Sequence, residues 1–240
     1  QSNRNDGVWT GRVGVALDVW QGGVIRAALG NAYRNPTIYE TDPAPPKPAN
    51  HDLKPEKAES WEIGVEQKLF GGAAKIGAVY FNTKTTDKIV SGGSSAVPFT
   101  NLDRAKSGGV ELTAGATLGA FELSANYTYT KAVNSATDRQ FDHIPEHAGS
   151  IDATWRATKA LALGGEVIWN GEENDFNFGA PFTAVTVPSW TRADLRASYT
   201  VSPQVEFYGR VENVTDEQYE DTFGYGSAGR SAYVGIRVKK

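Results

Sequence analysis

FELSANYTYT, at residues 121–130, alternates apolar and polar side chains at every step. One set of alternate residues is apolar or aromatic: Phe121, Leu123, Ala125, Tyr127 and Tyr129. The residues between them are all polar: Glu122, Ser124, Asn126, Thr128 and Thr130. Successive side chains of a β-strand point to opposite faces of the sheet, so this segment predicts a strand with one apolar and one polar face.

The same period of two recurs along the chain. It is found at 61–69, 150–157, 192–201 and 205–212. No segment shows a helical stripe, with a period of about 3.6 residues, for longer than a turn. The sequence therefore predicts an all-β chain. We expect about eleven strands of roughly 10–13 residues, near 8–20, 22–34, 58–70, 73–90, 106–118, 120–132, 148–158, 160–172, 190–201, 204–213 and 228–239.

The connections between these strands alternate sharply in length. The short ones carry turn residues, such as Gly22-Gly23 and Gly71-Gly72. The long ones span 35–57, 91–105, 133–147, 173–189 and 214–227. In an up-and-down antiparallel sheet every second connection emerges on the same side. One rim should therefore carry tight turns and the other long loops.

Composition excludes several classes of protein. None of the 240 residues is a cysteine, which excludes a disulfide scaffold and Cys-ligated zinc or iron–sulfur sites. The formal charge of −4 gives no basic footprint, so we expect no nucleic-acid partner. No stretch reaches the roughly 18 consecutive apolar residues of a transmembrane helix, and the first residues lack the pattern of a signal peptide. A membrane protein built from strands is still allowed.

Two interpretations compete for the apolar face: the core of a soluble sandwich or lipocalin-like barrel, or the lipid-facing wall of a membrane barrel. The strands are about twice the usual five or six residues of soluble domains. Aromatic residues lie near strand ends, as in an interfacial girdle. The polar face carries charges at strand centres, which suit a hydrated lumen better than a dry core: Glu62, Glu66, Glu111, Asp152, Arg156, Arg192, Asp194, Arg196, Glu206 and Arg210. These features favour a transmembrane barrel.

Several passages resemble the C-terminal half of TonB-dependent outer-membrane receptors. They follow the family's order, at points where strands meet loops: AYRNPTIYE (32–40), NHDLKPEK (50–57), WEIG (61–64), VYFN (79–82), DKI (87–89), NLDRA (101–105), GVEL (109–112), VENVTDEQYE (211–220), GYG (224–226) and GR (229–230). The resemblance covers essentially the whole chain. Within the family the pattern is most similar to receptors of the vitamin B12 and siderophore type.

The resemblance implies the C-terminal part of an antiparallel up-and-down transmembrane β-barrel of about 22 strands with a plug inside. Residues 1–240 would supply about half of these strands, and neither the plug domain nor the TonB box is visible in them. The implied location is the Gram-negative outer membrane. The implied function is TonB-driven uptake of a bulky nutrient, such as an iron–siderophore complex, haem or cobalamin. A passive porin-like channel and a soluble β-barrel binding module are the alternatives.

The implied partners are the lipid bilayer, lipopolysaccharide, the plug domain, the remaining barrel strands, TonB and the nutrient. An odd number of antiparallel strands cannot close on itself, and open edges are costly in lipid, so we expect the chain to be incomplete as a transporter. One departure from the family is the last residue, Lys240, where an aromatic residue is usual. This puts efficient assembly in doubt, or indicates a truncated or engineered end.

Contact with the nutrient is expected from aromatic residues of the long loops. The candidates are Tyr39, Phe99, Phe141, Phe178, Phe182 and Tyr225. Aromatic rings at the mouth could hold a large planar or macrocyclic ligand. For any single ring, loop packing or contact with lipopolysaccharide is the simpler explanation.

Metal binding and catalysis are weakly indicated. DHIPEH (142–147) holds two histidines and two carboxylates, but Pro145 prevents a helical pairing of the imidazoles, so an ordinary loop is favoured. The acidic run at 172–175 lacks the ligand alternation of a calcium loop. No catalytic motif stands out, so we expect no enzyme activity, no metal and no resident cofactor.

Overall fold

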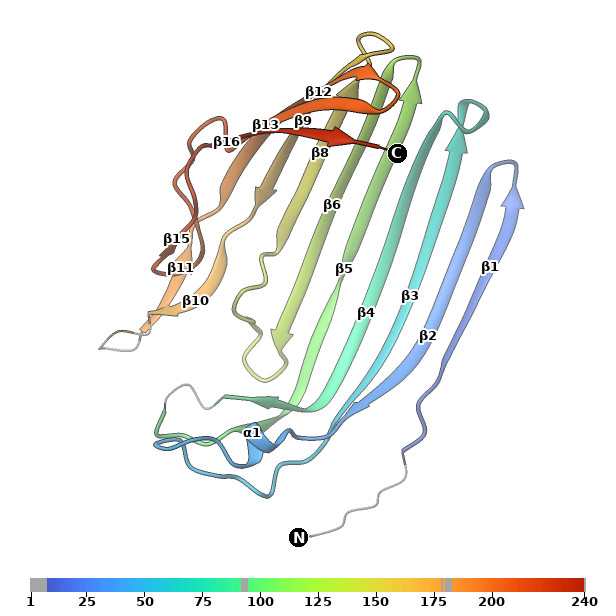
Figure 1. The fold of residues 1–240 in the computed structure, drawn as a ribbon. Coiled ribbons are helices and arrows are strands. Elements are labelled where there is room, and N and C mark those ends of the chain that lie inside the picture. The colour runs from blue at the N-terminus through green and yellow to red at the C-terminus, as the bar shows by residue number, and fades with distance from the viewer. Residues whose placement is uncertain (1–7, 92–94, 178, 180–182, 240) are drawn as a thin grey trace.

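The protein is a long antiparallel sheet that curves into a trough (Figure 1). A computed structural model describes residues 8–91, 95–177, 179 and 183–239. Eleven strands follow one another across the sheet, each antiparallel to the next. They are β1 (Arg12–Trp20), β2 (Gly23–Arg34), β3 (Glu56–Leu69), β4 (Ala74–Val90), β5 (Thr100–Leu118), β6 (Phe121–Asn134), β8 (His147–Trp155), β9 (Leu161–Asn170), β12 (Trp190–Ser202), β13 (Val205–Glu212) and β16 (Ser231–Val238). The predicted up-and-down β class is confirmed.

Short turns gather at one end of the sheet and long connections at the other (Figure 1). Gly22 and Gly119 lie in tight turns with φ of 76° and 61°, a left-handed conformation that a residue with a Cβ adopts only with strain. The η1 turn (Phe70–Gly72) joins β3 to β4. The predicted asymmetry of the two rims is therefore present.

The structure differs from the sequence expectations mainly at the long-loop rim. β5 begins at Thr100, six residues before the expected start at 106. The long connections also carry small elements that the sequence pattern did not predict: α1 (Ile38–Thr41), β7 (Arg139–Gln140), β10 (Glu173–Asn177), β11 (Thr183–Val187), β14 (Glu220–Thr222) and β15 (Tyr225–Gly226). β10 pairs with β11 and β14 with β15, while β7 pairs with β6. The loops are therefore folded structures.

The apolar face of the sheet does not converge on an enclosed interior. Its large side chains are between 42% and 56% exposed: Phe121, Leu123, Trp155, Leu195 and Phe207. They pair across strands on one face, since Phe121 lies opposite Trp155 and Tyr199 opposite Phe207. This arrangement suits a lipid-facing wall.

The polar face carries ion pairs that reach over an intervening strand. Arg12 Nη2 of β1 lies 2.8 Å from Glu62 Oε1 of β3, and Gly30 of β2 lies directly opposite Arg12. On β9, Gly164 similarly lies between the strands of Arg196 and Asp152. Side chains converge only on the concave side of a curved sheet, so we assign the charged face to the inside of the trough.

Buried apolar side chains gather at the long-loop rim. Among the described residues the buried hydrophobic set is Leu53, Ile89, Ala105, Ala132, Val133 and Val187. All of them lie in the loops or at the strand ends that bear them. The loops are therefore packed against the wall. In the described part of the chain, no helix has the length and hydropathy needed to cross a bilayer.

Candidate functional site

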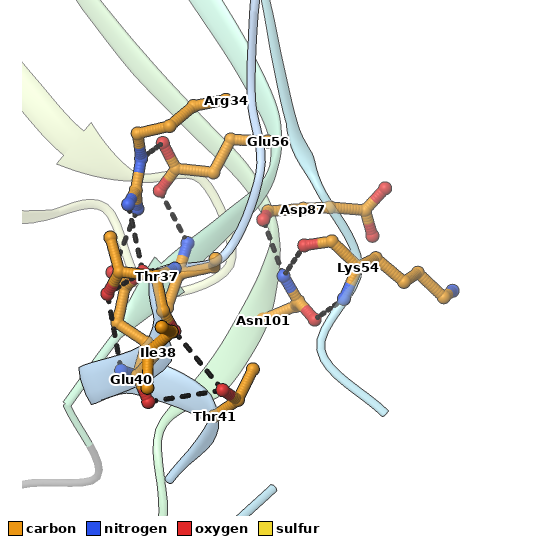
Figure 2. Close-up of polar contacts among 10 residues, drawn as sticks. Arg34, Thr37, Ile38, Glu40, Thr41, Lys54, Glu56, Asp87 and Asn101 are labelled. Carbon is orange, nitrogen blue, oxygen red and sulfur yellow. Dashed lines mark hydrogen bonds and ion pairs between the residues drawn. The ribbon is translucent and has the colours of Figure 1, made fainter. Parts of the chain in front are cut away.

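The loop between β2 and β3 is fastened to the wall by Arg34, the last residue of β2. Its Nη1 and Nη2 donate to the two carboxylate oxygens of Glu40 at 2.9 and 3.0 Å, and its Nε donates to Glu56 Oε2 at 2.8 Å. Figure 2 shows the guanidinium between the two carboxylates. One planar cation thus joins the short helix α1 to the first residue of β3.

The helix α1 begins with a capping box. Thr37 Oγ1 accepts a hydrogen bond from the Glu40 amide, and the Thr37 amide donates back to Glu40 Oε2 at 2.7 Å. The hydrogen bonds from Arg34, followed by those from the Thr37 amide and hydroxyl, lower the pKa of Glu40 from 4.5 to about 2 despite partial burial. The carboxylate is therefore ionised under all ordinary conditions.

The other end of this loop is held by Asn101 of β5. Its Oδ1 accepts from the Lys54 amide at 2.8 Å, and its Nδ2 donates to the Lys54 and Asp87 carbonyls at 2.9 and 2.7 Å (Figure 2). Asp87 has φ of 54°, which turns its carbonyl out of the regular strand pattern. One amide side chain therefore satisfies three backbone groups on two segments.

The loop also docks on the connection between β4 and β5. Asn50 Nδ2 donates to the Phe99 carbonyl, and Lys47 Nζ donates to the Val97 carbonyl, both at 2.8 Å. The Lys47 ammonium lies 5.0 Å from the centre of the Phe99 ring. Tyr39 meets the same ring edge to face, with centroids 5.7 Å apart. These residues form the first loop group, comprising residues 35–55 and 95–99.

The second loop group comprises the connection between β6 and β8 (residues 135–146) and β10 (Glu173–Asn177). Gln140 anchors it, because its Oε1 accepts from the Ala132 amide and its Nε2 donates to the Thr130 and Ile144 carbonyls. The Arg139 guanidinium lies 5.2 Å from the Phe176 ring of β10 and pairs with Asp142 at 2.7 Å.

A cavity of about 860 Å³ lies between the two loop groups. Lys47 and Ser91 contribute to one wall, while Arg139, Phe141 and Phe176 contribute to the other. A second cavity of about 380 Å³ lies between Phe141 and the wall residues Thr85, Ala105 and Ser107. Lys88 extends to 5.5 Å from the Phe141 ring.

The chemistry of the larger cavity favours an anionic ligand with aromatic groups. Two cations, Lys47 and Arg139, line it together with the rings of Phe141 and Phe176 and one carboxylate, Asp142. Cations also lie over three rings of the loops, in the pairs Lys47–Phe99, Lys88–Phe141 and Arg139–Phe176. Such rings offer apolar contact area, while the cations beside them attract negative charge. The volume falls within the range of small-molecule sites.

The sequence-predicted site residues take different positions. Tyr39 and Phe99 contact each other in the first loop group, and Phe141 lines both cavities. Tyr225 is 73% exposed on β15 and lines neither of these two cavities. Phe178 and Phe182, like the chain-terminal Lys240, lie outside the described residues.

Sequence reasoning missed the cations beside the rings. Lys47, Lys88 and Arg139 each lie over an aromatic ring that is distant in sequence or in another element. Only the presence of basic residues within the aromatic loops could have indicated them, and that signal does not specify which ring each cation meets.

The two histidines of the 142–147 segment contact different partners. His143 Nε2 lies 3.3 Å from Asp175 Oδ1, whereas His147 Nδ1 is hydrogen-bonded to the Tyr127 hydroxyl at 2.7 Å. Nor do the described residues contain any group of three or more His, Cys, Asp or Glu side chains arranged to hold a metal ion. The acidic run at 172–175 is partly buried, with Glu173 and Asp175 inside the loop packing.

Comparison with known proteins gives one family match. The family model described as "TonB dependent receptor-like, beta-barrel" matches residues 1–214. A curated relative, the probable TonB-dependent siderophore receptor PiuA of Acinetobacter baumannii, is 26% identical over an alignment 213 residues long that covers 79% of this chain and 28% of the relative.

Solved structures give the same architecture. The ferric-catecholate import receptor Fiu of E. coli K12 is similar with a TM-score of 0.77 at 19% identity, covering 95% of this chain and 34% of that one. The ferripyoverdine receptor of the Pseudomonas aeruginosa outer membrane is similar with a TM-score of 0.77 at 16% identity, covering 95% and 32%. The chain thus spans about a third or less of the length of these relatives.

Proposed function

The chain belongs to the TonB-dependent receptor β-barrel family, and from this premise we propose that it forms part of the wall and outer mouth of an outer-membrane receptor for a ferric siderophore. In this proposal the long loops capture the ligand. TonB then drives rearrangement of a plug domain so that the ligand passes through the barrel. The chain's own role is binding and passage, without catalysis.

The observation that carries the proposal is the cavity between the two loop groups. Its lining combines cations with aromatic rings, including Lys47, Arg139 and Phe176. A ferric siderophore is a large metal chelate that often carries negative charge and aromatic iron ligands. Such a ligand would bury its rings against the phenylalanines and place its charge beside the cations.

The names of the relatives also support a siderophore. PiuA is described as a siderophore receptor, Fiu as a ferric-catecholate import receptor, and the Pseudomonas structure as a ferripyoverdine receptor. None of these three is named for haem or cobalamin, so we do not extend the proposal to those nutrients.

We further propose that residues 1–240 are the C-terminal part of a longer receptor that contributes a plug and further strands. Among the described residues, β1 pairs only with β2, and β16 only with β13. Unpaired strand edges in lipid cost several kcal/mol for each backbone group, so additional strands would be strongly favoured at both edges. Mass analysis of the native mature protein tests this, since a product of only 25.8 kDa would contradict it.

Uptake by the intact receptor tests the function. The receptor would be produced in the outer membrane of a host that lacks its own siderophore receptors. Labelled ferric tris-catecholate, ferric tris-hydroxamate, haem and cobalamin would then be offered separately. We expect saturable uptake of a ferric chelate that disappears when TonB is deleted.

Two other results would redirect the proposal. Uptake that neither saturates nor depends on TonB would indicate a passive channel. Saturable uptake of haem or cobalamin alone would support the role as a receptor but contradict a ferric siderophore as the ligand.

A further inference from the structure

Three loops that are far apart in sequence meet at the carboxylate of Asp175 on β10. Its Oδ1 accepts the Phe176 amide at 2.7 Å, and its Oδ2 accepts the Phe223 amide of the connection between β13 and β16, also at 2.7 Å. His143 Nε2, from the connection between β6 and β8, lies 3.3 Å from Oδ1. The Asp175 side chain is fully buried.

The neighbouring residue adds two more links between the same loops. The Asn174 carbonyl accepts the His143 amide at 3.0 Å, and Asn174 Nδ2 donates to the Gln140 carbonyl at 3.0 Å. Gln140 is itself anchored on β6, so these contacts connect β10 to the wall. β11, which pairs with β10, also contacts β14.

Because the Asp175 carboxylate is buried, its loss should affect the packing of the loops around it. A buried carboxylate is tolerated only where donors replace its lost water. Asp175 accepts two backbone amides, and the His143 imidazole lies 3.3 Å away. Removing the acceptor would also leave the Phe223 amide without its partner, so the loss would affect a different loop from the one mutated.

We propose that Asp175 is a positioning residue that latches the connection 135–146, the strands β10 and β11, and the connection 214–230 into one unit. Phe176 follows Asp175 directly, and His143 lines the cavity along with Arg139. The latch therefore lies immediately behind the second wall of the cavity. Its effect on ligand binding rests on the proposed function, whereas the latch itself can be measured without ligand.

The first wall of the cavity is anchored separately. Arg34, Asn50 and Asn101 hold it through hydrogen bonds that involve none of the latched connections. Loss of Asp175 should therefore loosen one wall and leave the other in place. This asymmetry distinguishes a latch from general destabilisation.

The test uses the full receptor with Asp175→Asn and Asp175→Ala, and with Asp138→Asn as the matched control. Asp138 is an exposed aspartate of the connection 135–146 that pairs with Lys131, and it is not one of the residues bonded to Asp175. Hydrogen–deuterium exchange would be followed in peptides covering 139–146, 173–177 and 219–226, and in a reference peptide covering 37–54.

We expect Asp175→Ala to accelerate exchange in all three latched peptides, including that of the Phe223 amide, while 37–54 and the control variant stay unchanged. Asp175→Asn keeps one acceptor oxygen and should give a smaller effect. Acceleration confined to β10 and β11, or spread equally over 37–54, would overturn the latch. If Asp175→Ala fails to assemble, exchange in the same peptides is compared between Asp175→Asn and Asp138→Asn. Equal exchange in these two variants would then overturn the latch.

Ligand binding gives the second readout, with ferric tris-catecholate as the probe. We expect Asp175→Asn to weaken binding roughly tenfold, through faster dissociation, with no change in barrel melting. Unchanged dissociation together with accelerated exchange would show that the latch does not shape the site. If the wild-type receptor binds no ferric chelate while the exchange pattern holds, the proposed function fails and the latch stands.

Discussion

Arg196 of β12 reaches across Gly164 of β9 to bind Asp152 of β8, with Nη2 2.8 Å from Asp152 Oδ1. The same nitrogen donates to Thr154 Oγ1 at 2.7 Å. The path depends on the missing side chain, because a Cβ at Gly164 would lie 2.6 Å from Arg196 Nε. Three strands of the inner wall are therefore tied together by one guanidinium.

Gly164→Ala should displace the Arg196 guanidinium and lower the free energy of unfolding of the barrel by about 1 kcal/mol, which is the scale of a partly exposed ion pair. Thermal unfolding of the intact receptor in detergent measures this. Gly115→Ala is the control, since a Cβ there would meet its nearest neighbour at an ordinary 3.8 Å. Equal melting of the two variants would contradict the role of Gly164.

Arg34→Lys should loosen the connection between β2 and β3. A lysine ammonium cannot bind Glu40 through two parallel hydrogen bonds and Glu56 at the same time. We expect roughly tenfold faster hydrogen exchange in 37–54, corresponding to about 1.4 kcal/mol. Arg12→Lys, at an exposed single ion pair on the neighbouring strand β1, should leave these amides unchanged.

The same connection should loosen in acid. Because the folded pKa of Glu40 is lowered from 4.5 to about 2, its contribution to stability is present above pH 4.5 and is lost as the pH falls toward 2. Pepsin cleavage within 42–53 should therefore rise over this range relative to cleavage of the other loops in the same sample. A constant ratio would argue against the ion pair as the anchor.

Glu173→Gln should stabilise the β10–β11 hairpin at neutral pH. Burial is the main cause that raises the pKa of Glu173, with Asp221 and Asp175 adding to it and His143 opposing it. Stability from this group is complete below its ordinary pKa of 4.5 and is lost as pH rises through the folded pKa. Exchange in 173–187 should be slower in Glu173→Gln at pH 7, whereas the exposed neighbour variant Glu172→Gln should behave as wild type.

Arg139→Gln should reduce affinity for an anionic ferric chelate roughly tenfold, because it removes a cation from the cavity and from the face of Phe176. Binding of ferric tris-catecholate, followed by intrinsic fluorescence quenching, measures the change. Lys131→Gln removes an equal charge at a position that does not line the cavity. Equal losses in the two variants would indicate a general charge effect.

The wall of this protein was predictable because each strand carries its own pattern. Segment 121–130 alternates throughout and forms a strand from Phe121 to Asn134. The early part of β5 was missed because Asn101 and its neighbours lack alternation and pair with β4 beyond the irregular Asp87. Their strand conformation depends on the partner.

The rim was predictable only in part. Tyr39, Phe99 and Phe141 were identified as loop aromatics, but their partners come from distant segments, as with Lys47 over Phe99. The contacts of Asp175 are also tertiary, and nothing in the local run at 172–175 indicates that one carboxylate is fully buried. Contacts between loops depend on the order of strands in the sheet, which periodicity alone does not give.

The unpaired edge of β1 predicts how residues 1–240 behave when they are refolded alone in water. Its residues, Arg12–Trp20, are exposed on both faces, and their outward backbone groups have no strand beside them among the described residues. Such an edge is a template for another copy of the same strand. Residues 1–240 refolded alone in water should therefore grow thioflavin-positive cross-β aggregates. A proline placed at Ala16, whose N–H points away from β2 in this register, should slow that growth.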